Sequence, residues 1–110
     1  MTRRLVFLES PYAGDVIRNV AYAKACMFDS IQRGEAPFAS HLLYAQAGIL
    51  DDTNVNEREA GIQCGLAWAE KAEATVVYMD LGVSPGMKRG IDAAKVCGRS
   101  VEYRFLYGDG

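Results

Sequence analysis

The feature that most constrains the fold is the run Ala74-Thr75-Val76-Val77-Tyr78-Met79. It is apolar and rich in β-branched residues, and it lacks the alternation of polar and apolar positions that a half-exposed strand shows. A continuous run of this kind is typical of a strand that is buried on both faces of a parallel sheet. Helices must then cover both faces, so the run predicts an α/β domain.

The rest of the chain alternates between strand-like and helix-like segments. We expect further strands at residues 5–9, 37–39 and 101–106, and helices at about residues 15–33, 56–72 and 85–96. This alternation predicts a parallel sheet with right-handed crossovers and helices on both faces. The length of 110 residues allows one domain. We therefore expect a single α/β domain over residues 1–110, with three layers and about four parallel strands.

The first two helices carry recognisable sequence signals. Asp15 is a candidate N-cap of the first helix. In the second, Asn56 followed by Glu59 resembles a capping box, with Asn in place of Ser or Thr. Apolar residues recur along the first helix at spacings of three and four, which predicts that one stripe faces the core. That stripe consists of Val16, Val20, Ala23, Met27 and Ile31.

Composition excludes several classes of function. The formal net charge of −2 gives no overall basic field, and Arg3-Arg4 and Lys88-Arg89 are only local basic pairs, so no nucleic-acid partner is expected. No run approaches transmembrane length, and the N-terminus lacks the long apolar stretch of a secretory signal. We expect a cytoplasmic protein that does not bind membranes.

The three cysteines point in the same direction. Cys26, Cys64 and Cys97 are an odd, widely spaced set among apolar helical residues, and we interpret them as reduced core thiols. No CxxC pattern or Cys/His spacing indicates a metal site. Neither a metal nor another cofactor is expected.

The end of the first strand is the first candidate for a binding site. The apolar segment 5–8 gives way to the turn Glu9-Ser10-Pro11-Tyr12-Ala13-Gly14-Asp15. Ligands of open α/β sheets bind where strands end at their carboxyl edges, so Ser10, Tyr12 and Asp15 are expected to project into a site. A tyrosine offers a flat stacking face and a hydroxyl group, which suits a nucleobase or a sugar.

Two other segments are expected at the same edge. His41, the only histidine, follows a short strand, and it could contact a ligand, act as an acid or base, or tie down its loop. Asp80 closes the buried strand and precedes a turn into a helix. Ser84 with the amides of Gly86 and Met87 could bind an anion such as phosphate, and a simple helix cap by Ser84 is the alternative.

Further charged residues have open interpretations. Asp51 and Asp52 could hold a ribose hydroxyl or a metal, or form a solvated turn. Arg58 could bind a carboxylate or phosphate, or be an exposed helix charge. Trp68 and Tyr78 are interpreted as core or subunit-interface residues.

Taken in order, several motifs resemble one small family. They are Ser10-Pro11-Tyr12-Ala13-Gly14-Asp15, Asn19 and Ala23, Pro37-Phe38-Ala39-Ser40-His41-Leu42-Leu43, Leu50-Asp51-Asp52, Glu57-Arg58-Glu59-Ala60-Gly61 and Ser84-Pro85-Gly86-Met87. The chain resembles mostly uncharacterised bacterial and phage domains related to the nucleoside 2-deoxyribosyltransferases. The resemblance covers nearly the whole chain. It implies a flavodoxin-like fold and a protein that cleaves or exchanges the N-glycosidic bond of nucleosides or their 5′-phosphates.

The resemblance also implies roles for residues. Tyr12 would lie by the base or the catalytic carboxylate, Asp80 would contact the sugar, and Ser84 and Gly86 would contact a phosphate. The full set of expected ligand-binding residues is Ser10, Pro11, Tyr12, Asp15, His41, Asp80, Ser84, Gly86 and Met87.

One position departs from the family pattern. The catalytic glutamate of the superfamily falls at Gly90, which has no side chain to react. Asp80 and Glu9 are the candidates to supply a carboxylate instead. The sequence therefore predicts a nucleoside- or nucleotide-handling protein with altered or impaired catalysis. The alternative is a non-catalytic binder, or sponge, of a nucleotide or nucleotide-derived signal. In either case we expect a homodimer or larger homo-oligomer.

Overall fold

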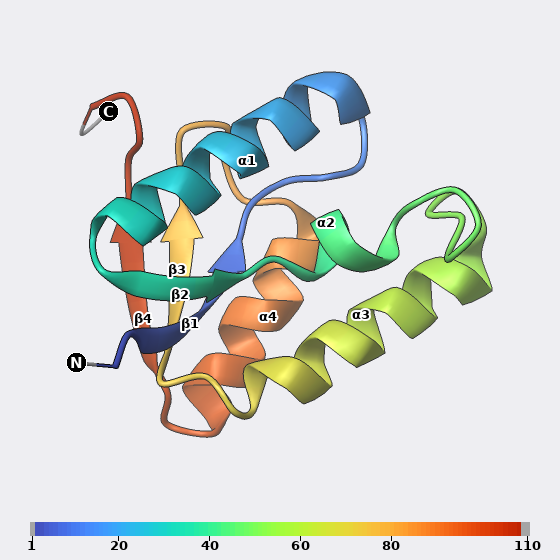
Figure 1. Ribbon diagram of the computed structural model, residues 1–110. Coiled ribbons are helices and arrows are strands. Elements are labelled where there is room, and N and C mark those ends of the chain that lie inside the picture. The colour runs from blue at the N-terminus through green and yellow to red at the C-terminus, as the bar shows by residue number, and fades with distance from the viewer. Residues whose placement is uncertain (1, 109–110) are drawn as a thin grey trace.

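The computed structural model of the protein describes residues 2–108 and contains four strands and four helices within them (Figure 1). In chain order they are β1 (Arg4–Glu9), α1 (Val16–Gln32), β2 (Glu35–Phe38), α2 (Ser40–Tyr44), α3 (Val55–Ala69), β3 (Ala74–Tyr78), α4 (Pro85–Val96) and β4 (Ser100–Arg104). The expected strands and helices are all present, and a further short helix, α2, follows the second strand.

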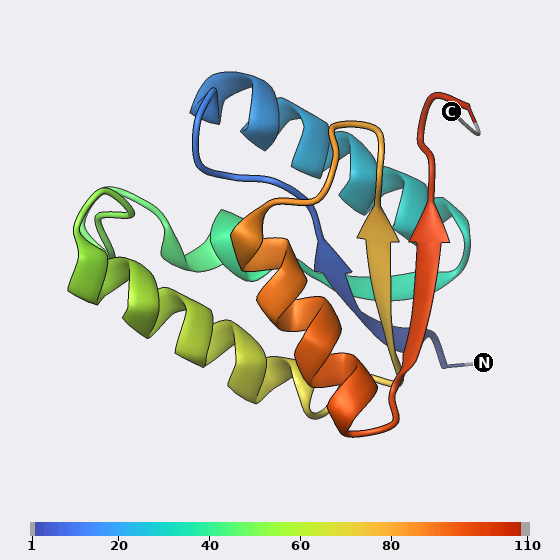
Figure 2. The same cartoon turned by 180° about the vertical axis from the view of Figure 1, so that it is seen from behind.

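The four strands form one parallel sheet in the order β2-β1-β3-β4. Every residue of β3 is buried, as the apolar run predicted. Helix α1 covers one face of the sheet, while α3 and α4 lie on the other (Figures 1 and 2). The prediction of a three-layer α/β domain is confirmed, and the strand order is that of flavodoxin-like folds.

The strand order also indicates where a ligand would bind. The chain leaves β1 toward β2 on one side and later returns to place β3 on the other side. Such a reversal creates a crevice at the carboxyl ends of the two central strands, which is the usual ligand position in doubly wound sheets. The turn after β1 and the turn after β3 both lie at this end.

Alternation along β1 assigns its side chains to the two faces. Val6 and Leu8 belong to the apolar cluster beneath α1, together with Tyr22 and Cys26. The side chain of Glu9 points to the opposite face of the sheet from Leu8, because successive residues of a strand point to opposite faces. It therefore faces α3 and α4, and this orientation brings it into the site described below.

The predicted core stripe of α1 is only partly correct. Val16 and Ile31 are exposed, with 39% and 42% of their surface accessible. The buried residues of this helix are Asn19, Tyr22, Ala23, Cys26 and Ser30. Two of these buried residues are polar, and each has a hydrogen-bond partner. The Asn19 amide donates to the carbonyls of Tyr12 and Ala13, at 2.9 and 3.1 Å, and Ser30 donates to Glu35.

Two other local predictions are corrected. The N-cap of α3 is Asn54, whose side chain accepts the amides of Asn56 and Glu57, so the helix begins earlier than the Asn56 signal indicated. Cys26 is buried, but Cys64 and Cys97 are exposed. Cys64 lies on an exposed face of α3 and Cys97 is the C-cap of α4, and an apolar neighbourhood in the sequence does not reveal this exposure.

Candidate functional site

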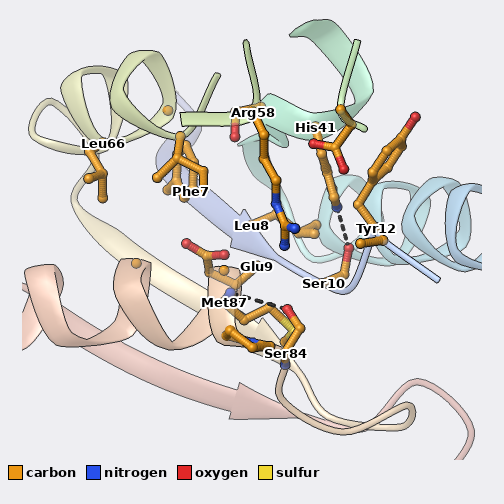
Figure 3. A pocket seen from close by; sticks show the side chains of 18 residues that line it. Phe7, Leu8, Glu9, Ser10, Tyr12, His41, Arg58, Leu66, Ser84 and Met87 are labelled. Atoms are coloured by element: carbon orange, nitrogen blue, oxygen red, sulfur yellow. Dashed lines mark hydrogen bonds between the residues drawn. The ribbon is translucent and has the colours of Figure 1, made fainter. Parts of the chain in front are cut away.

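A cavity of about 200 Å³ opens at the carboxyl edge of β1, between this strand, α2, α3 and the N-terminus of α4 (Figure 3). Its walls combine apolar side chains with a few polar groups. The polar and turn residues in its lining are Glu9, Ser10, Tyr12, His41, Asp52 and Arg58, followed by Ser84, Gly86, Met87 and Gly90. The volume exceeds the roughly 150 Å³ of a cavity known to hold benzene, so one ring system fits.

Glu9 and Gly90 fit against each other at the floor of this cavity. An ideal Cβ atom built on Gly90 would lie 1.8 Å from Oε2 of Glu9 and 2.7 Å from its carboxyl carbon. The space that a side chain at this position of α4 would take is therefore filled by a carboxyl group from β1. A larger residue at this position would displace the Glu9 carboxyl group.

The environment of Glu9 changes its chemistry. Within residues 2–108 no hydrogen bond or ion pair holds its carboxyl group. Burial without a partner disfavours the charged form and raises the pKa of Glu9 to about 8, although the positive charge of Arg99 opposes the rise. At neutral pH this side chain is mostly protonated, so it can donate a proton.

Ser10, His41 and Tyr12 form the opposite wall. The Ser10 hydroxyl lies 2.9 Å from Nε2 of His41, and the rings of Tyr12 and His41 are 5.9 Å apart. Burial lowers the pKa of His41 to about 4, so the imidazole is neutral at pH 7. Tyr12 donates its hydroxyl to the carbonyl of Ala45, which fixes the ring between the β1 turn and the segment after α2.

The first turn of α4 forms the third wall. Ser84 accepts the amide of Met87 at 3.2 Å, so the helix-cap interpretation of Ser84 is correct. This contact leaves the hydroxyl hydrogen of Ser84 free for a ligand. Pro85 has no amide hydrogen, and the Gly86 amide lies in the first turn, where backbone donors lack intrahelical partners. Gly86 lines the cavity, and the Met87 amide is already bonded to Ser84.

Arg58 reaches into the cavity from α3. Figure 3 shows its guanidinium group pointing between Glu9 and Ser10. No ion pair involves Arg58 anywhere in the described part of the chain. Asp52 lines the same cavity, and partial burial raises its pKa while Arg58 lowers it. The cavity thus contains one cation available to an anionic ligand group.

Comparison with known families decides the classification. The model of a family described as "Domain of unknown function (DUF7768)" matches residues 4–104. The chain belongs to this DUF7768 family. A comparison with curated protein sequences finds no match.

The fold has a solved counterpart. The DUF7768 domain is similar to a 2-deoxyribosyltransferase from the psychrotolerant bacterium Bacillus psychrosaccharolyticus, with a TM-score of 0.65 and 18% sequence identity. The match covers 96% of this chain and 75% of that one. The expected flavodoxin-like fold of the deoxyribosyltransferases is thereby confirmed.

Three of the expected site residues of the DUF7768 domain lie outside the cavity. Pro11 and Asp15 are absent from its lining, and Asp15 caps α1 by accepting the amide of Arg18 at 3.1 Å. Asp80 is turned away as well. Its carboxylate accepts the amides of Leu106 and Tyr107, at 2.7 and 3.0 Å, and these bonds hold the segment after β4.

The prediction that Asp80 contacts the ligand therefore disagrees with the structure. The chain turns toward β4 immediately after β3, and Asp80 also accepts the hydroxyl of Tyr22 from α1. These bonds lower its pKa despite the opposing effect of burial. Asp80 joins α1 and the segment after β4 and does not line the cavity.

The structure adds apolar walls that the sequence did not assign to a site. Phe7, Ile62 and Leu66 line the cavity. Helix α2 comes close to α3 at Gly65, since a Cβ atom there would lie 2.6 Å from Oγ of Ser40. The spacing of apolar residues along a helix does not distinguish a core face from a cavity wall.

The structure also bears on metal and membrane partners. Among residues 2–108 no three His, Cys, Asp or Glu side chains are grouped so that they could hold a metal ion. No helix of the described chain is both long and apolar enough to cross a membrane. The homodimer and the cytoplasmic location stay predictions.

Proposed function

We propose that this DUF7768 domain binds a nucleoside or nucleotide in the cavity and cleaves or transfers its N-glycosidic bond, with Glu9 as the reacting carboxyl group. The observation that carries the proposal is the unpaired carboxyl group of Glu9, seated in the space that Gly90 leaves open. The similarity in fold to a 2-deoxyribosyltransferase supports this class of substrate.

Glu9 has the protonation state that the reaction requires. A carboxyl group with a pKa of about 8 is protonated at pH 7 and can give its proton to the leaving base. The bond between the anomeric carbon and the base nitrogen then breaks, and its electron pair stays with the protonated base. The Glu9 carboxylate that remains stabilises the cationic sugar or bonds to its anomeric carbon. Water or a second base completes the reaction.

The other polar groups hold the ligand. Ser10 and Tyr12 are placed to contact a base or sugar, and His41 orients the Ser10 hydroxyl. A 5′-phosphate would accept hydrogen bonds from the Ser84 hydroxyl and the Gly86 amide, with Arg58 supplying charge. We expect a nucleoside 5′-monophosphate to bind more tightly than its nucleoside.

A non-catalytic binder is the second candidate, and Gly90 favours it. With no side chain on α4, the cavity floor has a single protonated acid, which can donate a hydrogen bond to an intact ligand. In that case the domain would retain a nucleotide, or a signal derived from one, without turnover, as a phage-encoded sponge would.

One experiment separates these functions. The protein is incubated with nucleosides and nucleoside 5′-monophosphates of the common bases, and free base is measured by chromatography while mass spectrometry detects retained ligand. Release of free base supports the enzyme, and retention of intact ligand without release supports the binder. If the protein neither releases a base nor retains a ligand, both forms of the proposal are wrong.

A further inference from the structure

A second, larger hollow adjoins the cavity. It has a volume of about 760 Å³ and lies between the turn after β1 and the segment from Ala45 to Thr53. The two hollows share Tyr12, Ala13, Asp52 and Arg58 in their walls. The cavity at Glu9 therefore continues, past Tyr12 and Arg58, into a groove with room for much more than a phosphate.

Charged residues line this path. Arg58 and Asp52 lie at the boundary that the cavity and the groove share, and the carboxylates of Asp51 and Glu57 line the groove beyond it. Asp51 accepts the amide and hydroxyl of Thr53 through Oδ1, and Glu57 accepts the amide of Asp51 through Oε1. Their remaining oxygen lone pairs can accept hydrogen bonds from a ligand.

This arrangement of charges selects a kind of ligand. A phosphate near the boundary is attracted by Arg58, and the first turn of α4, which lines the cavity and not the groove, supplies further donors. A further anionic group in the groove would meet three carboxylates and be repelled. Sugar hydroxyls suit the groove, because each can donate a hydrogen bond to a carboxylate oxygen.

We propose that the groove is a second subsite, and that the ligand is a nucleotide whose 5′-phosphate carries a neutral, hydroxyl-bearing group such as a sugar. This inference rests on the proposed function, which places the nucleoside part in the cavity at Glu9. The phosphate lies at the boundary by Arg58, and the attached sugar lies in the groove between the β1 turn and Asp51.

Calorimetry with a graded ligand set tests the inference. The ligands are nucleosides, nucleoside 5′-diphosphates, the matching diphosphoglucose compounds and 5′-triphosphates of adenine, guanine, cytosine and uracil. A parallel series with Glu9→Gln keeps cleavage from distorting the titrations. For the base that fits, we expect the diphosphoglucose compound to bind about tenfold or more tightly than the diphosphate. The triphosphate is expected to bind more weakly than the diphosphoglucose compound.

A matched pair of variants locates the effect. Asp51→Asn removes a charge from the groove but keeps an oxygen that can accept the Thr53 bonds. It is expected to reduce the advantage of the diphosphoglucose compound severalfold and to improve triphosphate binding. Asp92→Asn removes the same charge from α4, where Asp92 pairs with Lys88 outside both hollows, and is expected to change neither affinity.

The results separate the two proposals. If nucleosides or diphosphates bind but glucose adds no affinity, or if the triphosphate binds best, the second subsite is wrong and the proposed function stands. If Asp51→Asn and Asp92→Asn change the affinities equally, the groove is not the location. If no ligand of the set binds, the proposed function is overturned together with this inference.

Discussion

Two glutamates on neighbouring strands, Glu9 at the end of β1 and Glu35 at the start of β2, show how partners decide the effect of burial. Glu35 lies beneath α1 and bonds to Arg104 at 2.6 Å, Arg4 at 2.7 Å and Ser30 at 2.8 Å. Chiefly through the bond to Arg104, these contacts lower the pKa of Glu35 to about 2. Glu9 faces the opposite side without such contacts, and burial raises its pKa to about 8.

The comparison separates a carboxylate with structural partners from one that is a candidate for chemistry. Glu35 is charged at every physiological pH and joins β1, β2, β4 and α1 through its bonds. Glu9 joins nothing, and its burial costs stability at neutral pH. A group that is buried, unpaired and adjacent to a cavity is a candidate for chemistry, whereas a fully paired one is a candidate for stability.

The largest expected effect is on turnover. Glu9→Gln removes the acidic proton while keeping the size of the side chain, so release of free base should fall by about 10²–10⁴-fold. Glu35→Gln serves as the control, since per folded molecule it should keep most of the activity. Chromatography of the reaction products measures both. Equal losses in the two variants would contradict the assignment of Glu9.

For stability, the larger effect is expected at Glu35 and the smaller one at Glu9. Glu35→Ala leaves the buried Arg104 without its main partner, and it should lower the free energy of unfolding by roughly 3–5 kcal/mol. Glu9→Gln should leave the stability at pH 7 unchanged or higher. Urea unfolding followed by circular dichroism compares them. A large loss from Glu9→Gln would mean that Glu9 has structural partners after all.

The pH dependence of stability isolates Glu9. Its pKa is 4.5 unfolded and about 8 folded, so between these values the native state holds one proton more and stability falls as pH rises. His41 has the opposite effect below pH 6.5, because its pKa drops to about 4 on folding. The two slopes cancel between pH 4.5 and 6.5. Above 6.5 only Glu9 remains, and up to about 2 kcal/mol should be lost by pH 8.

Unfolding measured at pH 6.5, 7.25 and 8 tests this expectation. The wild type should lose stability across the three values, and Glu9→Gln should show a flat profile. His41→Gln is the complementary variant: it should keep the loss above pH 6.5. A wild-type profile that is already flat would show that Glu9 ionises normally.

Gly90→Ala tests the fit between helix and strand. The added methyl group must displace the Glu9 carboxyl group, which is the flexible end of a side chain, so stability should change by no more than about 1 kcal/mol. Displacement toward solvent lowers the pKa of Glu9, so the loss of stability above pH 6.5 should shrink. Gly86→Ala is the matched control for stability, with nothing nearer than 4.0 Å to the new atom. If the pH profile is unaltered in Gly90→Ala, the two residues do not compete for space.

The smallest effect on binding and turnover is expected at Asp80, the carboxylate that the sequence placed in the site. Asp80→Asn weakens the bonds to Tyr22 and to the amides of Leu106 and Tyr107, and should cost about 1–2 kcal/mol of stability. Nucleotide affinity and turnover per folded molecule should be unaltered, as calorimetry and chromatography would show. A selective loss of affinity in Asp80→Asn would return this residue to the site.

The sequence by itself determined those features that depend on neighbours along the chain. The buried run predicted β3, and the helix expected at about residues 85–96 is α4 with those bounds. Parallel strands align their carboxyl ends, so the general position of the site beyond β1 also followed. Glu9 was recognised as one of two candidate carboxylates, because both followed strand ends.

Only the tertiary structure showed which of these carboxyl groups borders the cavity, and only it assigned the faces. Glu9 and Gly90 are 81 positions apart in the chain. The sequence around either residue therefore does not indicate that the Glu9 carboxyl group fills the space beside Gly90. The same holds for Asp80, whose partners come from α1 and the segment after β4. A pKa depends on which groups surround a carboxyl group in space, so the opposite protonation of Glu9 and Glu35 is set by packing between distant segments.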